Sequence, residues 1–177
     1  TNMAEYTSRS FDLLTLGQLL LRLSPPDNDR LSRGDTFVKQ VGGAELNVAV
    51  GASLLGLRTG VISKLPSHDI GSFMKGKIRS FGVSDDFFMY DDSPSARVGI
   101  YYYENGAYPR KPKVIYDRMN SSFFSLNIDE IPKEVYTASK CFHTTGITLA
   151  LSPQIRETTI EMIKRFKEAG TLVSFDV

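Results

Sequence analysis

The chain alternates short apolar runs with segments of helical periodicity, and this alternation constrains the fold more than any other feature. In the helical segments apolar residues recur every three or four positions, whereas in the strand-like runs they are nearly continuous, as in strands buried on both faces. The predicted strands are 11–16, 59–65, 141–144 and 172–177, and the helices between them end at Gly56, Gly82 and Gly170. This rhythm predicts the α/β class, with a parallel sheet and crossover helices.

Two stretches interrupt the rhythm. Residues 21–41 are mostly polar and contain Pro25-Pro26, which predicts a segment that leaves the core. Residues 96–103 and 113–118 are rich in β-branched and aromatic side chains and flank a turn region, which is typical of a hairpin. We therefore assign 21–41 and 96–118 to a small β-sheet lid, and 11–20, 42–95 and 119–177 to the α/β domain.

Charge and cysteine content exclude several kinds of partner and site. The net charge is +1 with both signs interspersed, so we expect neither nucleic acid nor a membrane surface as a partner. A single cysteine, Cys141, and the lack of a run of about 18 apolar residues favour a reduced, cytoplasmic setting. His68 and His143 have no neighbours at zinc-ligand spacing, so no metal site is predicted.

The segment Gly42-Gly43-Ala44-Glu45-Leu46-Asn47 places two glycines directly before a helix. A backbone without side chains lets a ligand approach closely, and the first helix amides can receive hydroxyl or anionic oxygens. The same sequence is compatible with an ordinary turn. It is neither a Walker A loop nor a dinucleotide-binding fingerprint, because the Gly-Lys-Ser/Thr ending and the third spaced glycine are absent.

This segment, continued by Val48-Ala49 and followed by Leu54-Leu55-Gly56 and Asp69-Ile70-Gly71, resembles the amino-terminal signature of the ribokinase-like (PfkB) sugar kinases. Leu16-Gly17 and the stretch 146–152 are also similar to 2-keto-3-deoxygluconate kinases, so the resemblance covers nearly the whole chain. It implies a ribokinase-like sheet with a lid, a homodimer paired through the lid, and use of ATP and Mg.

The implied activity is ATP-dependent phosphorylation of a hydroxyl of a small sugar acid, with 2-keto-3-deoxygluconate as the first candidate. Fructose and 5-keto-2-deoxygluconate are alternative substrates on the same fold. A sugar-binding or regulatory module without catalysis is the alternative from another functional class.

By the same resemblance, Gly43 and Asn47 would bind sugar hydroxyls, and Tyr101, Tyr116 and Arg118 would hold the ketoacid. A planar guanidinium pairs with a carboxylate in a fork, which a neutral hexose does not need. Without the resemblance, Arg118 reads as a solvated strand residue and the tyrosines as lid packing. Two further candidates are Ile147, which either lines the pocket or belongs to the core, and Gln18, which stands where the family commonly has an acidic residue.

The last predicted strand, 172–177, ends the chain. In open α/β sheets the ligand-binding groups lie just beyond the carboxyl ends of the strands, and this family follows the matching strand with an Asn-Tyr-Arg-like loop. We therefore expect the carboxy-terminal ATP-binding and catalytic part to be absent. Catalytic and cofactor-binding residues would then lie outside this chain, most contacts to ATP and Mg would come from the missing half, and the chain alone would be inactive.

Overall fold

A computed structural model describes residues 2–177, and it contains the predicted parallel sheet. The main sheet has six strands, in the order β10-β9-β1-β4-β5, with β6 also paired to β4. Every pairing in this sheet is parallel. The strands are β1 (Phe11–Leu16), β4 (Thr59–Pro66), β5 (Val83–Ser84), β6 (Phe88–Asp91), β9 (Ser139–Thr145) and β10 (Leu172–Asp176).

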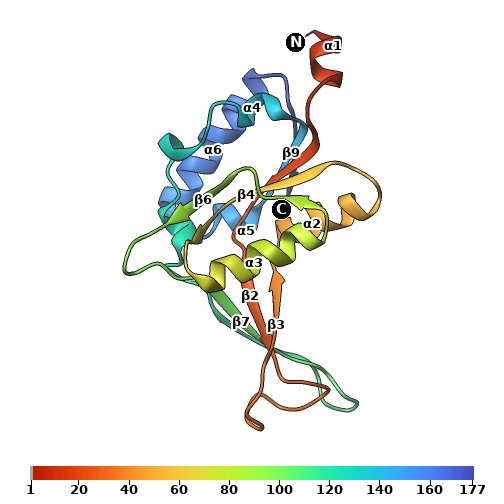
Figure 1. The fold of residues 1–177 in the computed structure, drawn as a ribbon, viewed down its shortest axis with the longest axis vertical. Coiled ribbons are helices and arrows are strands. Elements are labelled where there is room, and N and C mark those ends of the chain that lie inside the picture. The colour runs from red at the N-terminus through yellow and green to blue at the C-terminus, as the bar shows by residue number, and fades with distance from the viewer. Residues whose placement is uncertain (1) are drawn as a thin grey trace.

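Helices cover both faces of the main sheet (Figure 1). Helices α2 (Ala44–Leu54) and α3 (Asp69–Ser80) pack on one face around a cluster that includes Leu46, Val61 and Met74. Helix α6 (Pro153–Glu168) packs on the other face, where Phe166 stacks on Phe142 with ring centroids 4.1 Å apart. The shorter helices are α1 (Met3–Thr7), η1 (Ser122–Ser125), η2 (Ile128–Glu130), α4 (Val135–Ala138) and α5 (Gly146–Leu149).

The helix boundaries follow the signals in the sequence. Ser152 caps α6 by accepting a hydrogen bond from the Ile155 amide at 3.1 Å, and Pro153 is the first helical residue. The three glycines predicted as helix stops follow α2, α3 and α6, and each has a positive φ that other residues rarely adopt. These predicted helix ends are confirmed.

A smaller mixed sheet, the lid sheet, projects from one end of the α/β body (Figure 1). Its order is β3-β2-β7-β8, formed by β2 (Leu20–Ser24), β3 (Val38–Gly42), β7 (Gly99–Glu104) and β8 (Lys113–Asp117). The predicted hairpin is the antiparallel pair β7–β8, while β2 pairs with β7 in parallel. Leu21, predicted to leave the core, is instead buried in the apolar cluster beneath α2 and α3.

The main sheet has two strands that the sequence did not indicate. They are β5 and β6, which lie between α3 and the lid strand β7. Both strands pair with β4 and are only two and four residues long, too short to give a periodic pattern. Across residues 2–177, no helix has the length and apolar character needed to cross a bilayer.

Candidate functional site

A cavity of about 410 Å³ lies between the lid sheet and the first turns of α2 and α5. Helix α5 directly follows β9, so the cavity sits beyond the carboxyl end of a central strand, where α/β sheets commonly bind ligands. Six of the seven predicted site residues line it: Gly43, Asn47, Tyr101, Tyr116, Arg118 and Ile147. The seventh, Gln18, lies behind Arg118.

Gly43 forms the turn from the lid sheet into α2. Its φ of 143° lies in the region that favours glycine, and a Cβ there would approach the Gln18 carbonyl oxygen to 2.8 Å. The Asn47 backbone amide donates a hydrogen bond to the Gly43 carbonyl at 2.9 Å, while the Asn47 side chain is exposed and lines the cavity. The glycine pair therefore brings backbone close to the space that a ligand would fill.

Tyr101 and Tyr116 form one wall of the cavity. They are direct cross-strand partners on β7 and β8, with ring centroids 6.0 Å apart. The Tyr101 ring occupies the space that a side chain at Gly42 would need. Burial raises the pKa of the Tyr101 hydroxyl, which keeps this group protonated and able to donate at neutral pH.

Arg118 follows β8 and is held by Gln18. The Arg118 Nε donates to the Gln18 Oε1 at 2.9 Å, and the Gln18 Nε2 donates to the Arg118 carbonyl at 2.9 Å and to the Ser121 hydroxyl at 2.7 Å. Burial lowers the pKa of the Arg118 guanidinium, although it stays charged at neutral pH. Gln18 is 2 % exposed and does not line the cavity, so its contacts orient the arginine.

A buried carboxylate, which was not predicted, supports the floor of the cavity. The Glu45 Oε1 accepts hydrogen bonds from the hydroxyls of Thr145 at 2.7 Å and Thr148 at 2.6 Å. These contacts tie the first turn of α2 to the turn that carries Ile147. The negative charge of Glu45 also favours the charged form of Arg118.

Two lid residues that the sequence analysis missed also line the cavity, Arg22 on β2 and Tyr103 on β7. The Arg22 guanidinium lies over the Tyr103 ring, 4.4 Å from its centroid. Arg22 stands between Leu21 and Leu23 in a strand. Because side chains alternate between the two faces of a strand, this pattern could have indicated that Arg22 faces away from the core. The remaining lining residues are Leu20, Ala44 and Val114.

Among the described residues, the cavity lining contains two arginines and no carboxylate. Within residues 2–177, no group of three or more histidine, cysteine or acidic side chains is arranged to hold a metal ion. The described residues therefore do not fit a magnesium site, whereas they do fit an anionic organic ligand.

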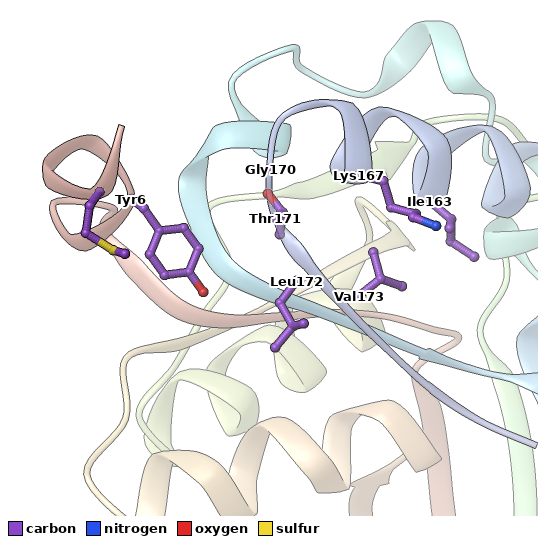
Figure 2. Close-up of a pocket in the computed structure, with 8 residues that line it drawn as sticks. Tyr6, Ile163, Lys167, Gly170, Thr171, Leu172 and Val173 are labelled. Atoms are coloured by element: carbon purple, nitrogen blue, oxygen red, sulfur yellow. The ribbon is translucent and has the colours of Figure 1, made fainter. Parts of the chain in front are cut away.

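A second, larger cavity of about 780 Å³ shares no lining residue with the first and lies along β10 (Figure 2). Its walls are mainly apolar side chains and backbone from α1, α6 and β10, and among residues 2–177 Lys167 is the only charged side chain that lines it. Because few polar groups converge there, we assign the candidate site to the smaller cavity.

Comparisons with known proteins show which family the chain is similar to. The family model described as pfkB family carbohydrate kinase matches residues 10–176. The chain is 39 % identical over 166 residues to a 2-dehydro-3-deoxygalactonokinase from Haloferax volcanii, covering 94 % of this chain and 51 % of the relative. It is 30 % identical over 171 residues to a 5-dehydro-2-deoxygluconokinase from Clostridium beijerinckii, and this match covers 96 % of this chain and 50 % of the relative.

A solved structure shows the same arrangement of elements. The crystal structure of 2-dehydro-3-deoxygluconokinase from Thermotoga maritima superposes with a TM-score of 0.88 at 34 % identity, over 94 % of this chain and 51 % of that one. The chain thus spans about half the length of the relatives it matches.

Proposed function

Because the chain belongs to the pfkB family of carbohydrate kinases, we propose that the protein transfers the γ-phosphoryl group of ATP to a hydroxyl of a small sugar acid. The first candidate substrate is 2-keto-3-deoxygluconate. Its galactonate epimer and 5-keto-2-deoxygluconate are close alternatives, because relatives that act on each type of acid match this chain.

The choice of an acid as substrate rests on one observation: Arg118 forms no ion pair with an acidic residue of the described chain. Its Nε is occupied by Gln18, while none of the ion pairs within residues 2–177 involves Arg118. The terminal nitrogens are therefore available for a fork-like contact with a carboxylate. Fructose lacks that group, so this site favours a ketoacid over the neutral sugar.

The other predicted residues have compatible roles in this proposal. Tyr101 donates to a ligand oxygen, Tyr116 covers the ligand from the exposed end of the lid, and Asn47 and the Gly43 backbone contact hydroxyls. Ile147 closes the apolar side of the cavity. Together these groups bind and orient the acid, which is a large part of the catalytic task in phosphoryl transfer.

We also propose that the protein continues beyond Val177 and that the added part binds ATP and Mg and supplies the catalytic base. The shared length of about half supports this view. A second support is the open edge strand β10, where Leu172 is 63 % exposed and Phe175 is 43 % exposed, since proteins usually cover such edges. No catalytic step is assigned to residues of the present chain.

A coupled ADP-release assay on the product of the full reading frame tests the activity. We expect turnover with one of the three ketoacids, little with fructose, and a large loss of kcat/KM for the ketoacid in Arg118→Gln. Turnover with fructose that is unaffected by Arg118→Gln would contradict the choice of an acid.

The same assay separates the kinase from a sugar-binding module without catalysis. A module would bind the ketoacid, as measured by calorimetry, but would release no ADP above background. The intact mass of the expressed protein gives independent information, because a kinase of this family should be well above 19.7 kDa.

A further inference from the structure

We propose that Arg22 is a specificity-determining residue that makes the cavity prefer acidic over neutral ligands, in addition to Arg118. This inference rests on the proposed function and names a determinant of its substrate class. Arg22 lies on β2 and Arg118 follows β8, so the two cations reach the same cavity from different strands of the lid sheet.

The register of the lid sheet places Arg22 on the face that carries the ligand-binding tyrosines. Arg22 pairs with Tyr101 across β2 and β7, and Tyr101 pairs with Tyr116 across β7 and β8. Directly opposed residues share one face of a sheet, so these three side chains form a row along the cavity wall. The positive charge of Arg22 acts to lower the pKa of Tyr101, against the larger effect of burial, as expected for neighbouring groups.

The Arg22 side chain is held in place by neutral groups. Its Nε donates to the Ser24 hydroxyl at 3.2 Å, one terminal nitrogen donates to the Gln40 Oε1 at 3.2 Å, and the Tyr103 ring covers one face. A guanidinium has five N–H groups, so these two bonds leave others for a ligand. A side chain fixed in this way loses little further freedom when it binds a ligand.

The charge of Arg22 is uncompensated at this site. None of the ion pairs within residues 2–177 includes Arg22, and no residue lining the cavity is acidic. Arg22 and Arg118 outnumber the one carboxylate beneath the cavity, that of Glu45, so the charge around the cavity is net positive and attracts an anion. A neutral sugar of the same shape gains hydrogen bonds there but no attraction of this kind.

Equilibrium titrations of the full reading-frame product with 2-keto-3-deoxygluconate and with its neutral carboxamide test this role. For Arg22→Gln we expect the affinity for the acid to fall about tenfold, equivalent to about 1.4 kcal/mol, while the affinity for the amide changes less than about twofold. Arg22→Lys should retain most of the preference for the acid, because it keeps the charge. Raising the salt concentration should narrow the difference between wild type and Arg22→Gln.

The matched control is Arg30→Gln, which removes an exposed arginine from the lid away from the cavity and should leave both affinities unchanged. An equal loss of acid and amide binding in Arg22→Gln would mean that Arg22 only supports the lid, and would overturn the inference. If wild type binds the acid, and this binding is lost in Arg118→Gln but kept in Arg22→Gln, only the inference about Arg22 fails. If wild type binds no acid, the proposed function fails as well.

Discussion

At the scale of single residues, the cavity depends on polar side chains that orient other side chains. Gln18 binds both the backbone and the guanidinium of Arg118, and Glu45 joins two turns through Thr145 and Thr148. An amide at position 18 orients the arginine without neutralising it, which leaves the positive charge available for a ligand. The chemistry of the cavity is therefore set partly by residues that a ligand would not touch.

We predict that Gln18→Leu weakens binding of the ketoacid about tenfold and destabilises the fold by about 1–3 kcal/mol. The substitution frees Arg118 and leaves the buried Ser121 hydroxyl without its partner. The control Gln154→Leu removes one hydrogen bond, to the Leu126 carbonyl, from a residue that does not line the cavity. Calorimetric titration and urea unfolding measure the two effects, and unchanged acid affinity in Gln18→Leu would contradict the orienting role.

Much of this site was predicted because the resemblance to the family indicated which positions of the chain contact the substrate. Six of the seven proposed residues meet at one cavity, although their roles in binding remain predictions. The positions of Arg22 and Glu45 at the cavity were not predicted, for different reasons. Arg22 lay in the mostly polar segment 21–41, which was assigned to the lid without any role for its arginines. The partners of Glu45 are about a hundred positions away in the sequence.

At the scale of elements, close packing between strands and helices fixes the positions of small residues. In α3, a Cβ on Gly71 would collide with the Pro66 backbone carbonyl at the end of β4, whereas a Cβ on Gly76 would meet open space. The same helix thus offers two glycines with opposite expected effects.

We predict that Gly71→Ala destabilises the protein by about 1–3 kcal/mol, because the carbonyl belongs to a buried strand that cannot easily shift. Gly76→Ala should stabilise it by about 0.5–1 kcal/mol, since alanine is the better helix former. Urea unfolding of both variants checks the pair, and equal stability of the two would show that α3 does not pack on β4 as described.

An ionic cluster joins the starts of three strands in the main sheet. The Asp12 carboxylate on β1 accepts hydrogen bonds from the Arg58 backbone amide at 2.9 Å, from the Arg58 guanidinium at 3.1 Å and from the Lys140 amine at 3.0 Å. These bonds, led by those from Arg58, hold the pKa of Asp12 well below its usual range.

We predict that Asp12→Asn is less stable than wild type at neutral pH and that the difference shrinks in acid. Because the folded-state pKa of Asp12 is depressed, its stabilisation is fully present above the unfolded-state value of about 4 and is lost as the pH falls toward the folded-state value. Urea unfolding of both proteins between pH 7 and pH 3 measures this. A difference that stays constant across the range would argue against the ionic cluster.

The periodicity of the sequence predicted most of the order of helices and strands, but it did not predict some of the strand pairings. The three long helices α2, α3 and α6 and their glycine stops follow local signals, so they were predicted correctly, whereas the short helices were not predicted. The parallel pairing of β2 with β7 joins segments nearly eighty residues apart, and local patterns do not encode such a partner. The short strands β5 and β6 pair with β4 and place Val83 and Phe88 in the core, and neither contact shows in a pattern this short.

At the scale of the whole molecule, the lid has an outer face that one ligand does not cover. Tyr102 pairs with Ile115 across β7 and β8, and the Phe37 ring lies 5.9 Å from the Tyr102 ring. Phe37 is 46 % exposed and Ile115 is 45 % exposed. We propose that this apolar patch packs against the lid of a second copy in a homodimer.

Sedimentation velocity of the full reading-frame product tests the dimer. We expect a dimer for wild type and a shift toward monomer for Ile115→Lys, which places a charge in the patch. Ile160→Lys alters an isoleucine of similar exposure on α6 and should leave the dimer intact. A wild-type protein that sediments as a monomer at high concentration would rule out this assembly.

We propose that these 177 residues bind the sugar acid and that the intact protein transfers the phosphoryl group. The most direct test compares ketoacid binding and ADP release for the 177-residue chain and for the full reading-frame product under the same conditions. We predict that the intact protein binds the acid and releases ADP in an acid-dependent manner, while the chain alone releases none. Acid-dependent ADP release by the 177-residue chain itself would contradict this division.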